Sequence, residues 1–200
     1  MGRGAKVDFK ELKQFRDELE KNLYGEALEK FIEDCSKELA ARLLAKVIHM
    51  TPVGHKPEFQ GGEDEEFVKV KGKRGRTRTF YTAKAAQFHS FWIGYEGGTL
   101  RRGWTGGQDM KGDEYAKTLP IAHGSGVYTI EIVNPVEYAS YVEFGHRQTP
   151  GRYVPALGKR LKNGFVEGKK MLTISEDEIR RDAPRVLQNK LQQKLGELFK

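Results

Sequence analysis

The chain has 200 residues, enough for one well-cored domain or for one domain with an elaborated loop. Its 35 Lys and Arg residues against 28 Asp and Glu give a net charge of +7, which permits contact with DNA or an acidic protein surface without proving either. No apolar run approaches the ~20 residues that a membrane span needs, and no signal region follows the N-terminus, so we expect a soluble protein made in the cytoplasm. The single cysteine, Cys35, excludes an internal disulfide and a cysteine-clustered zinc site.

The first fifty residues predict two helices. Asp8 and Glu11 form a capping box ahead of a short apolar stripe, and Gly25 is expected to break that helix. Beyond Gly25, apolar residues recur every three or four positions and predict one long amphipathic helix. This stripe consists of Leu28, Ile32, Cys35, Leu39, Leu43 and Val47. Cys35 lies inside it, so we interpret Cys35 as a small core residue and not as a reactive thiol.

A basic β-hairpin is expected next. Residues 67–71 and 77–81 read as strands, and Gly72-Lys73-Arg74-Gly75 joins them. The hairpin carries six basic residues: Lys69, Lys71, Lys73, Arg74, Arg76 and Arg78. Two interpretations stay open, a solvated surface hairpin or a loop that faces phosphate or an acidic partner surface.

The middle of the chain is expected to lead into the main sheet. Residues 83–95 are too apolar for a free loop and predict a short helix or strand packed on the core. Residues 100–104 should begin the main sheet, and the glycine-punctuated residues 106–124 predict a mobile loop. In residues 128–132, apolar and polar side chains alternate, which predicts a central strand buried on one face.

A short helix should follow that strand. Asn134 is a favoured N-cap, Pro135 suits the first helical position, and Glu137 can complete a capping box. Gly145 can take the left-handed conformation that ends a helix. The helical side assigned to the sheet carries Pro135, Tyr138, Ala139 and Val142.

Two aromatic residues of this helix, Tyr141 and Phe144, lie toward the opposite side. Aromatic rings are costly to leave in water, so either the chain's own loop after His146 or a neighbouring subunit should cover them. We favour the neighbouring subunit, because an oligomer needs an apolar anchor that an isolated domain does not.

The C-terminal part predicts a basic loop, a strand and a helix. Residues 147–163 should form an extended surface loop with five basic residues, and Phe165 and Val166 an edge strand. Ser175 and Glu178 form a capping box that opens a C-terminal helix. Pro184 either kinks this helix or divides it into two. The basic residues of the loop are Arg147, Arg152, Lys159, Arg160 and Lys162.

The order of two motifs resembles the tail-completion, or head–tail joining, family of tailed bacteriophages. The first motif comprises Thr51, Pro52 and Val53, then Thr99, Leu100, Arg101, Arg102 and Trp104. The second comprises Asn134, Pro135, Tyr138, Ala139, Val142, Glu143, Gly145 and His146, followed by Gly164, Phe165, Val166, Gly168 and Met171. In the family the two pieces of the first motif usually lie close together. Residues 54–98 separate them here, so this segment is inserted or divergent.

From the periodicity and the resemblance together we expect one α+β domain over residues 1–200, with residues 54–98 as its elaboration. A small, mostly antiparallel sheet would pack against the long N-terminal helix, with a short helix after the central strand and a C-terminal helix. The resemblance implies a structural virion protein, made in the bacterial host, that forms a homo-oligomeric and commonly hexameric ring at the tail neck or collar. The implied partners are a tail tube or tail terminator protein, a head connector or adaptor protein, and DNA passing through the lumen, with no membrane and no cofactor.

Two sets of residues would carry this role. The basic residues facing a partner or DNA are Lys69, Lys71, Lys73, Arg74, Arg76, Arg78, Arg147 and Arg152. The subunit interface would use Tyr141, Glu143, Phe144 and His146.

Two other classes of function fit parts of the sequence. A basic nucleic-acid-binding protein would use the hairpin at 69–78 and the loop at 147–162 as its contact surface. An enzyme is less well supported, because the sequence contains no phosphate-binding loop, no nucleophile elbow and no HExxH motif. Glu143 and His146 are the best enzyme-like pair, and we interpret them as structural or interface residues.

Overall fold

The computed structural model describes residues 25–59, 63–72, 75–124 and 126–198. The described residues group into two compact units: those within 1–48, 109–133 and 174–200 form the first, and those within 49–108 and 134–173 the second. The expected helix after Asp8 lies outside the described residues. That the whole chain is one domain with an inserted segment stays a prediction.

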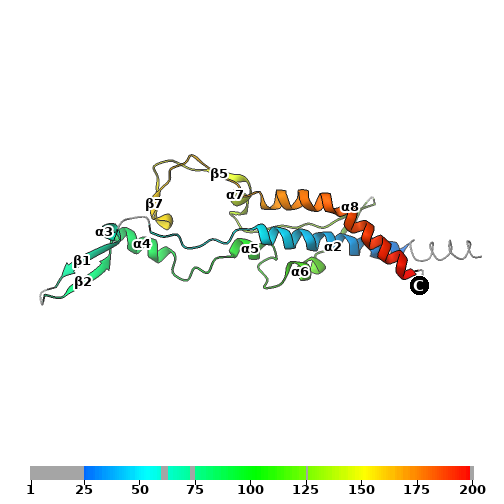
Figure 1. The fold of residues 1–200 in the computed structure, drawn as a ribbon, viewed down its shortest axis with the longest axis horizontal. Helices are drawn as coiled ribbons and strands as arrows, with labels where there is room; N and C mark the ends of the chain where they lie inside the picture. The colour runs from blue at the N-terminus through cyan, green and yellow to red at the C-terminus, as the bar shows by residue number, and fades with distance from the viewer. Residues whose placement is uncertain (1–24, 60–62, 73–74, 125, 199–200) are drawn as a thin grey trace, which may run out of the picture. The chain divides into compact units, whose positions relative to one another are not determined.

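The first unit is built on two long helices, α2 (Glu26–Met50) and most of α8 (Met171–Leu198). The two helices lie side by side (Figure 1). Lys190 of α8 contacts the Asp34 carbonyl of α2 at 3.4 Å and the Glu38 carboxylate of α2 at 4.0 Å. The α2 residues with the most deeply buried side chains are Cys35, Ala40, Leu44 and Val47. The long helix after Gly25 and the core position of Cys35 are therefore confirmed, whereas Ala40 and Leu44 are buried in place of the expected Leu39 and Leu43.

A short helix, α6 (Gly112–Thr118), packs on α2 in the same unit. Gly112 allows this approach, since a Cβ there would lie only 3.1 Å from Leu44 Cβ, and Ala116 is fully buried. β3 (Ala122–Gly124) then pairs antiparallel with β4 (Val127–Thr129). The prediction of a mobile loop over residues 106–124 was therefore wrong for its second half. The central strand is shorter than expected, because no described strand pairs with residues 130–132.

The second unit begins with α3 (Glu63–Glu66), β1 (Phe67–Lys71) and β2 (Thr77–Tyr81). β1 and β2 form the expected hairpin with Phe67 opposite Tyr81 and Lys71 opposite Thr77, which confirms both strands (Figure 1). α4 (Ala83–Phe91) follows, capped by the Thr82 hydroxyl, which accepts from the Ala85 N–H at 3.2 Å.

Residues 99–103 form helix α5 (Thr99–Gly103), so the expectation that residues 100–104 begin the main sheet was wrong. The reason is local. Gly98 has φ +78° and redirects the chain, and the Arg102 N–H then donates to the Gly98 carbonyl at 2.9 Å, which starts a helical turn.

The rest of the second unit consists of α7 (Ala139–Phe144) and short strands. β5 (Gly145–Arg147) pairs with β8 (Phe165–Glu167), and β6 (Tyr153–Val154) pairs with β7 (Lys159–Arg160) across the 3₁₀ turn η1 (Pro155–Leu157). The described strands thus make four separate two-stranded antiparallel sheets. The mixed fold class, with a long N-terminal helix, small antiparallel sheets and a C-terminal helix, is confirmed.

Two helix starts differ from the expected ones. Asn134 does not cap a helix: its side chain accepts from the Val136 N–H at 3.1 Å and donates to the Leu100 carbonyl at 2.8 Å. α7 therefore starts four residues later than predicted, at Ala139. α8 starts at Met171 and not near Ser175, which is buried inside the helix. Of the two alternatives for Pro184, the structure shows one undivided helix, and Figure 1 shows that α8 changes direction along its length.

Candidate interaction site around α7

Helix α7 is held in place by one buried carboxylate. Glu143 is 5% exposed, and its side chain accepts the backbone N–H groups of Leu172 and Thr173 at 2.9 and 3.0 Å. These N–H groups belong to the first turn of α8, which has no intrahelical acceptor for them and carries the positive end of the helix dipole. The backbone carbonyls of Val142 and Glu143 accept from Lys169 and Lys170 at 2.7 and 3.0 Å. The end of α7 and the start of α8 are therefore joined by both side-chain and backbone hydrogen bonds.

The chain turns sharply after α7 because Gly145 takes φ +84°, a value that favours glycine. Its N–H donates to the Tyr141 carbonyl and closes the helix, so the predicted helix end is confirmed. A Cβ at Gly145 would overlap the Val166 carbonyl of the paired strand. Glycine is thus required both for the turn and for the approach of β8.

One side of α7 carries two exposed aromatic residues. Tyr141 is 60% exposed and Phe144 is 70% exposed. The ring of Tyr141 lies 5.8 Å from the ring of His146, and the described residues of the second unit leave both aromatic side chains open to solvent. The chain's own loop after His146 therefore does not cover the two rings, and covering by a neighbouring subunit stays a prediction.

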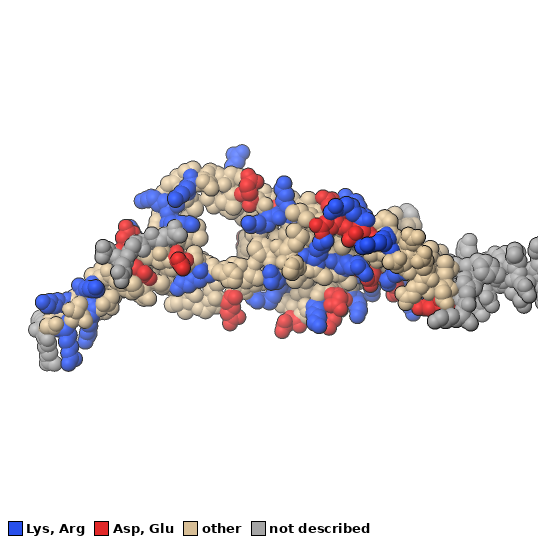
Figure 2. Space-filling view, viewed as in Figure 1, with Lys and Arg blue, Asp and Glu red and all other residues tan. Residues whose placement is uncertain are grey.

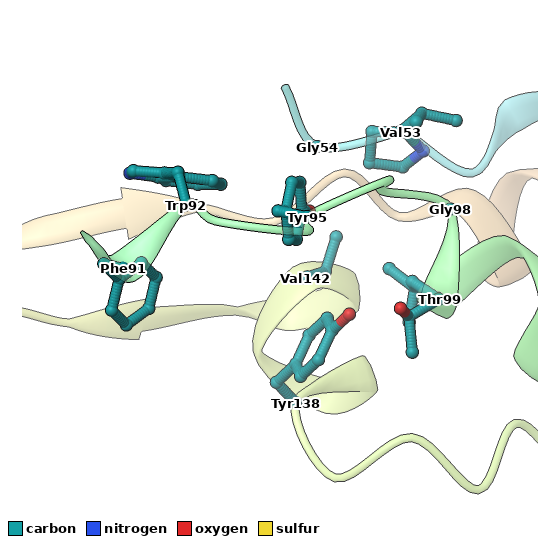
Figure 3. A pocket seen from close by; sticks show the side chains of 11 residues that line it. Val53, Gly54, Phe91, Trp92, Tyr95, Gly98, Thr99, Tyr138 and Val142 are labelled. Atoms are coloured by element: carbon teal, nitrogen blue, oxygen red, sulfur yellow. The ribbon is translucent and has the colours of Figure 1, made fainter. Parts of the chain in front are cut away.

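The other side of α7 borders an apolar pocket of about 390 Å³. Tyr138 and Val142 point from α7 toward Thr99 and Tyr95 (Figure 3). Trp92 stands edge-on to Tyr95 with ring centroids 4.7 Å apart. The lining residues are Pro52, Val53, Gly54, Phe91, Trp92, Tyr95, Gly98, Thr99, Leu100, Tyr138 and Val142. None of these side chains carries a charge, so the pocket suits an apolar or aromatic occupant.

Hydrogen bonds between distant segments hold the residues beside and within the wall of the pocket. The Trp104 indole N–H donates to the Thr51 hydroxyl at 2.7 Å, and both side chains are buried. The Arg101 guanidinium donates twice to the Thr51 carbonyl, at 2.7 and 3.2 Å. The Trp92 indole N–H donates to the Ala156 carbonyl at 2.8 Å. These bonds connect residues 50 to 64 positions apart in sequence, so they hold together segments of the second unit that border the pocket.

The strand register divides the hairpin into two chemically different faces. Cross-strand partners share a face, so Val68, Val70, Phe80 and Arg78 lie on one side. The other side carries Phe67, Lys69, Lys71, Thr77, Thr79 and Tyr81. Figure 2 shows Lys and Arg gathered along the hairpin, and no Asp or Glu occurs between residues 67 and 81. The first face is thus apolar with an arginine, whereas the second is polar and cationic.

The base of the second hairpin face is anchored on α4. The Tyr81 ring stacks on the Phe67 ring, with ring centroids 5.1 Å apart. The centroid of the Tyr81 ring also lies 4.3 Å from that of His89 in α4. His89 Nε2 also lies 2.9 Å from a Glu66 carboxylate oxygen. On the first face, Val68, Val70 and Phe80 are each about half exposed.

The other predicted site residues are dispersed. Arg76, Arg147 and Arg152 are exposed, as are Lys69, Lys71 and Arg78, whereas Lys73 and Arg74 lie outside the described residues. Glu143 lies inside its own unit and not at its surface. Because its carboxylate is already bonded to α8, it is not paired with His146, whose Nε2 lies 3.3 Å from the Gln148 amide.

Among the described residues, no group of three or more His, Cys, Asp or Glu side chains is placed to hold a metal ion. The described helices include none that is long and apolar enough to cross a membrane. Burial raises the pKa of the Cys35 thiol above its ordinary value.

Sequence reasoning missed the pocket. Its walls come from three segments, around residues 52–54, 91–100 and 138–142, and only the folded chain brings them together. The sequence does contain one signal for it: Phe91, Trp92 and Tyr95 lie within five residues, which makes this segment too apolar for a free loop. It also missed the capping role of Glu143, whose partners are 29 and 30 residues away.

A family model described as "Bacteriophage HK97-gp10, putative tail-component" matches residues 13–145, more than half of the chain. The match confirms the resemblance to phage tail proteins. Residues 164–171, which also contributed to that resemblance, lie beyond the matched range. The comparison found no match among curated proteins or solved structures.

Proposed function

The chain belongs to the HK97-gp10-like family of bacteriophage tail components, and from this premise we propose that it is a ring-forming subunit at the neck or collar of the tail. Membership itself makes it a structural protein of the tail, located in the virion among other tail proteins. The proposal goes further. A closed ring of identical copies, six in the commonest case, would complete the tail tube or contact its terminator protein and receive the head connector.

The observation that carries the proposal is the exposure of Tyr141 and Phe144 on one side of α7. Burying an aromatic or aliphatic side chain of this size contributes roughly 1.5–3 kcal/mol. Glu143 holds α7 in a fixed orientation, so the two rings are presented together and their ordering costs little entropy on association. An adjacent rigid pair of aromatic side chains is typical of a protein interface.

The hairpin supports a second contact of each subunit. The first face of the hairpin combines Val68, Val70 and Phe80 with Arg78. This combination suits a protein surface with an apolar centre and acidic residues at its rim. The head connector or a tail protein would supply that surface. Lys69 and Lys71 on the opposite face would then remain available to the phosphates of DNA passing through the lumen.

Electron microscopy of tails tests the proposed position and copy number. Particles carrying an epitope tag at the C-terminus of this chain should bind antibody at the head-proximal end of the tail, with several copies arranged about the axis. One copy per particle, or label along the whole tail, would contradict the ring at the neck.

A second candidate function is nucleic-acid binding, favoured by the absence of acidic residues from the hairpin between residues 67 and 81. A protein that neutralises several phosphates loses duplex affinity steeply between about 50 and 200 mM salt. A fluorescence titration of the purified chain with duplex DNA over that range distinguishes the two. Tight, steeply salt-dependent binding together with no self-association would favour the nucleic-acid binder.

A further inference from the structure

We propose that the apolar pocket beside α7 receives Tyr141 and Phe144 of a second copy of this chain, in a head-to-tail contact. The proposal rests on the ring proposed above and names the two surfaces that would meet in it. One helix thus supplies the inserted side chains on one side and part of the receiving pocket on the other.

The two surfaces cannot meet within one subunit. Tyr138 and Val142 line the pocket, whereas Tyr141 and Phe144 lie on the exposed side of the same helix. The hydrogen bonds from Glu143 to the start of α8 prevent α7 from turning about its axis. An aromatic pair and a pocket that lie on different sides of one fixed helix can be joined only between copies.

The chemistry of the pocket matches this occupant. Its lining has no charged side chain, so nothing in it would recognise a phosphate, a nucleotide or an acidic peptide. Trp92 and Tyr95 present ring edges and faces, against which further aromatic rings pack well. The hydroxyl groups of Tyr95, Thr99 and Tyr138 offer hydrogen-bond partners to the incoming Tyr141 hydroxyl.

The size of the pocket also fits. Its volume of about 390 Å³ is near the lower end of the ~300–1,000 Å³ range of sites that bury a small organic ligand, which leaves room for two aromatic side chains. A contact between two different surfaces of identical subunits is heterologous, and its repetition closes into a ring when the rotation permits. The proposed contact therefore yields the symmetry that a neck ring requires.

Cysteine cross-linking tests the contact directly. Wild-type Cys35 is buried, so the native chain serves as the unreactive control. A chain with both Thr99→Cys and Phe144→Cys, treated with a short bismaleimide, should give a ladder of covalent dimers, trimers and larger species up to the closed ring. Each single variant alone should stay monomeric, and a mixture of the two single variants should give dimers and nothing larger. The reaction is run on the purified chain and on assembled tails that carry it.

The outcomes separate this inference from the proposed function. Oligomeric rings without a cross-linked ladder would overturn the pocket contact and leave the ring in place. Dimers from Phe144→Cys alone would show a twofold contact and would also overturn it. A wild-type chain that self-associates neither in solution nor in tails would end both proposals. If circular dichroism shows that either substitution alters the fold, the pair Tyr95→Cys and Tyr141→Cys replaces it and is subject to the same outcomes.

Discussion

The carboxylate of Glu143 accepts hydrogen bonds from both the backbone N–H and the hydroxyl of Thr173, at 3.0 and 2.7 Å. A side chain at the end of one helix thereby caps the first turn of another, 30 residues later. The cap fixes which side of α7 borders the pocket and which side is exposed. The stability of the second unit and the geometry of the proposed contact therefore depend on the same buried group.

Replacing Glu143 should destabilise the folded chain. Glu143→Gln keeps the shape but removes the negative charge at the helix N-terminus and one acceptor oxygen, so we expect the free energy of unfolding to fall by about 1–3 kcal/mol. Urea denaturation followed by circular dichroism measures the change. The control is Glu137→Gln, an exposed carboxylate, which should stay within about 0.5 kcal/mol of wild type. Equal effects of the two substitutions would argue against the capping role.

The bond between Trp104 and Thr51 gives a second test of the pocket wall. Thr51→Val keeps the side-chain shape but leaves the buried indole N–H without its hydroxyl acceptor, which costs about 1–3 kcal/mol of unfolding free energy. Thr51→Ser keeps the acceptor and should lose less. Thermal unfolding of the two variants in parallel measures the difference. Equal melting temperatures would mean that the bond contributes nothing measurable.

The sequence predicted the elements whose signals are local. The hairpin at 67–81 follows from alternation around a glycine-flanked turn, α2 follows from its apolar period, and the end of α7 follows from Gly145. Each signal lies within a few residues of the structure that it specifies. Such features form wherever the rest of the chain allows them.

The features that were missed depend on distant partners. Asn134 accepts the Val136 N–H with its side-chain oxygen, as an N-cap would, but its amide also donates to the Leu100 carbonyl 34 residues away, and the helix starts only at Ala139. The start of α8 was placed at Ser175 because the actual capping group, Glu143, lies in another helix. No alternation or spacing in one sequence encodes such contacts, and the pocket built from three segments was hidden for the same reason.

The thiol of Cys35 should react slowly in the folded chain. Burial raises its pKa, nearby Lys190 partly opposes this, and the carboxylates of Asp34 and Glu38 add to it. The thiolate is the reactive form, so maleimide labelling should begin at a higher pH than for a free thiol and should accelerate in urea. The exposed thiol of Thr99→Cys is the control and should label rapidly at neutral pH.

The same raised pKa has a consequence for stability. The unfolded chain ionises its cysteine at the ordinary pKa, while the folded chain still holds the proton. This contribution to the free energy of unfolding is present below the ordinary pKa and is lost as the pH rises through the raised one. Rapid labelling of native wild-type protein at neutral pH would contradict the buried position.

The two faces of the hairpin should differ in what they contact. Arg76→Glu with Arg78→Glu changes the side next to Val70 and Phe80, whereas Lys69→Glu with Lys71→Glu changes the opposite side by the same charge. Exposed charges contribute little to fold stability, so both double variants should melt near wild type. If the apolar face contacts an acidic protein, the double arginine variant should lower the yield of complete particles more than the double lysine variant does. A larger effect of the lysine pair would instead assign the contact to the cationic face, as DNA binding requires.

The aromatic pair on α7 provides the decisive test of the ring. Tyr141→Ala with Phe144→Ser removes two side chains that are 60% and 70% exposed, so the isolated chain loses little buried area. Its melting temperature should therefore stay within a few degrees of wild type. Association should weaken strongly, because losing roughly 1.5–3 kcal/mol per buried ring reduces the affinity at each contact at least tenfold. Differential scanning calorimetry and native mass spectrometry measure the two effects separately. A strongly destabilised monomer would place both rings in the core, and the subunit contact would then have to be sought on the basic hairpin and the loop after His146.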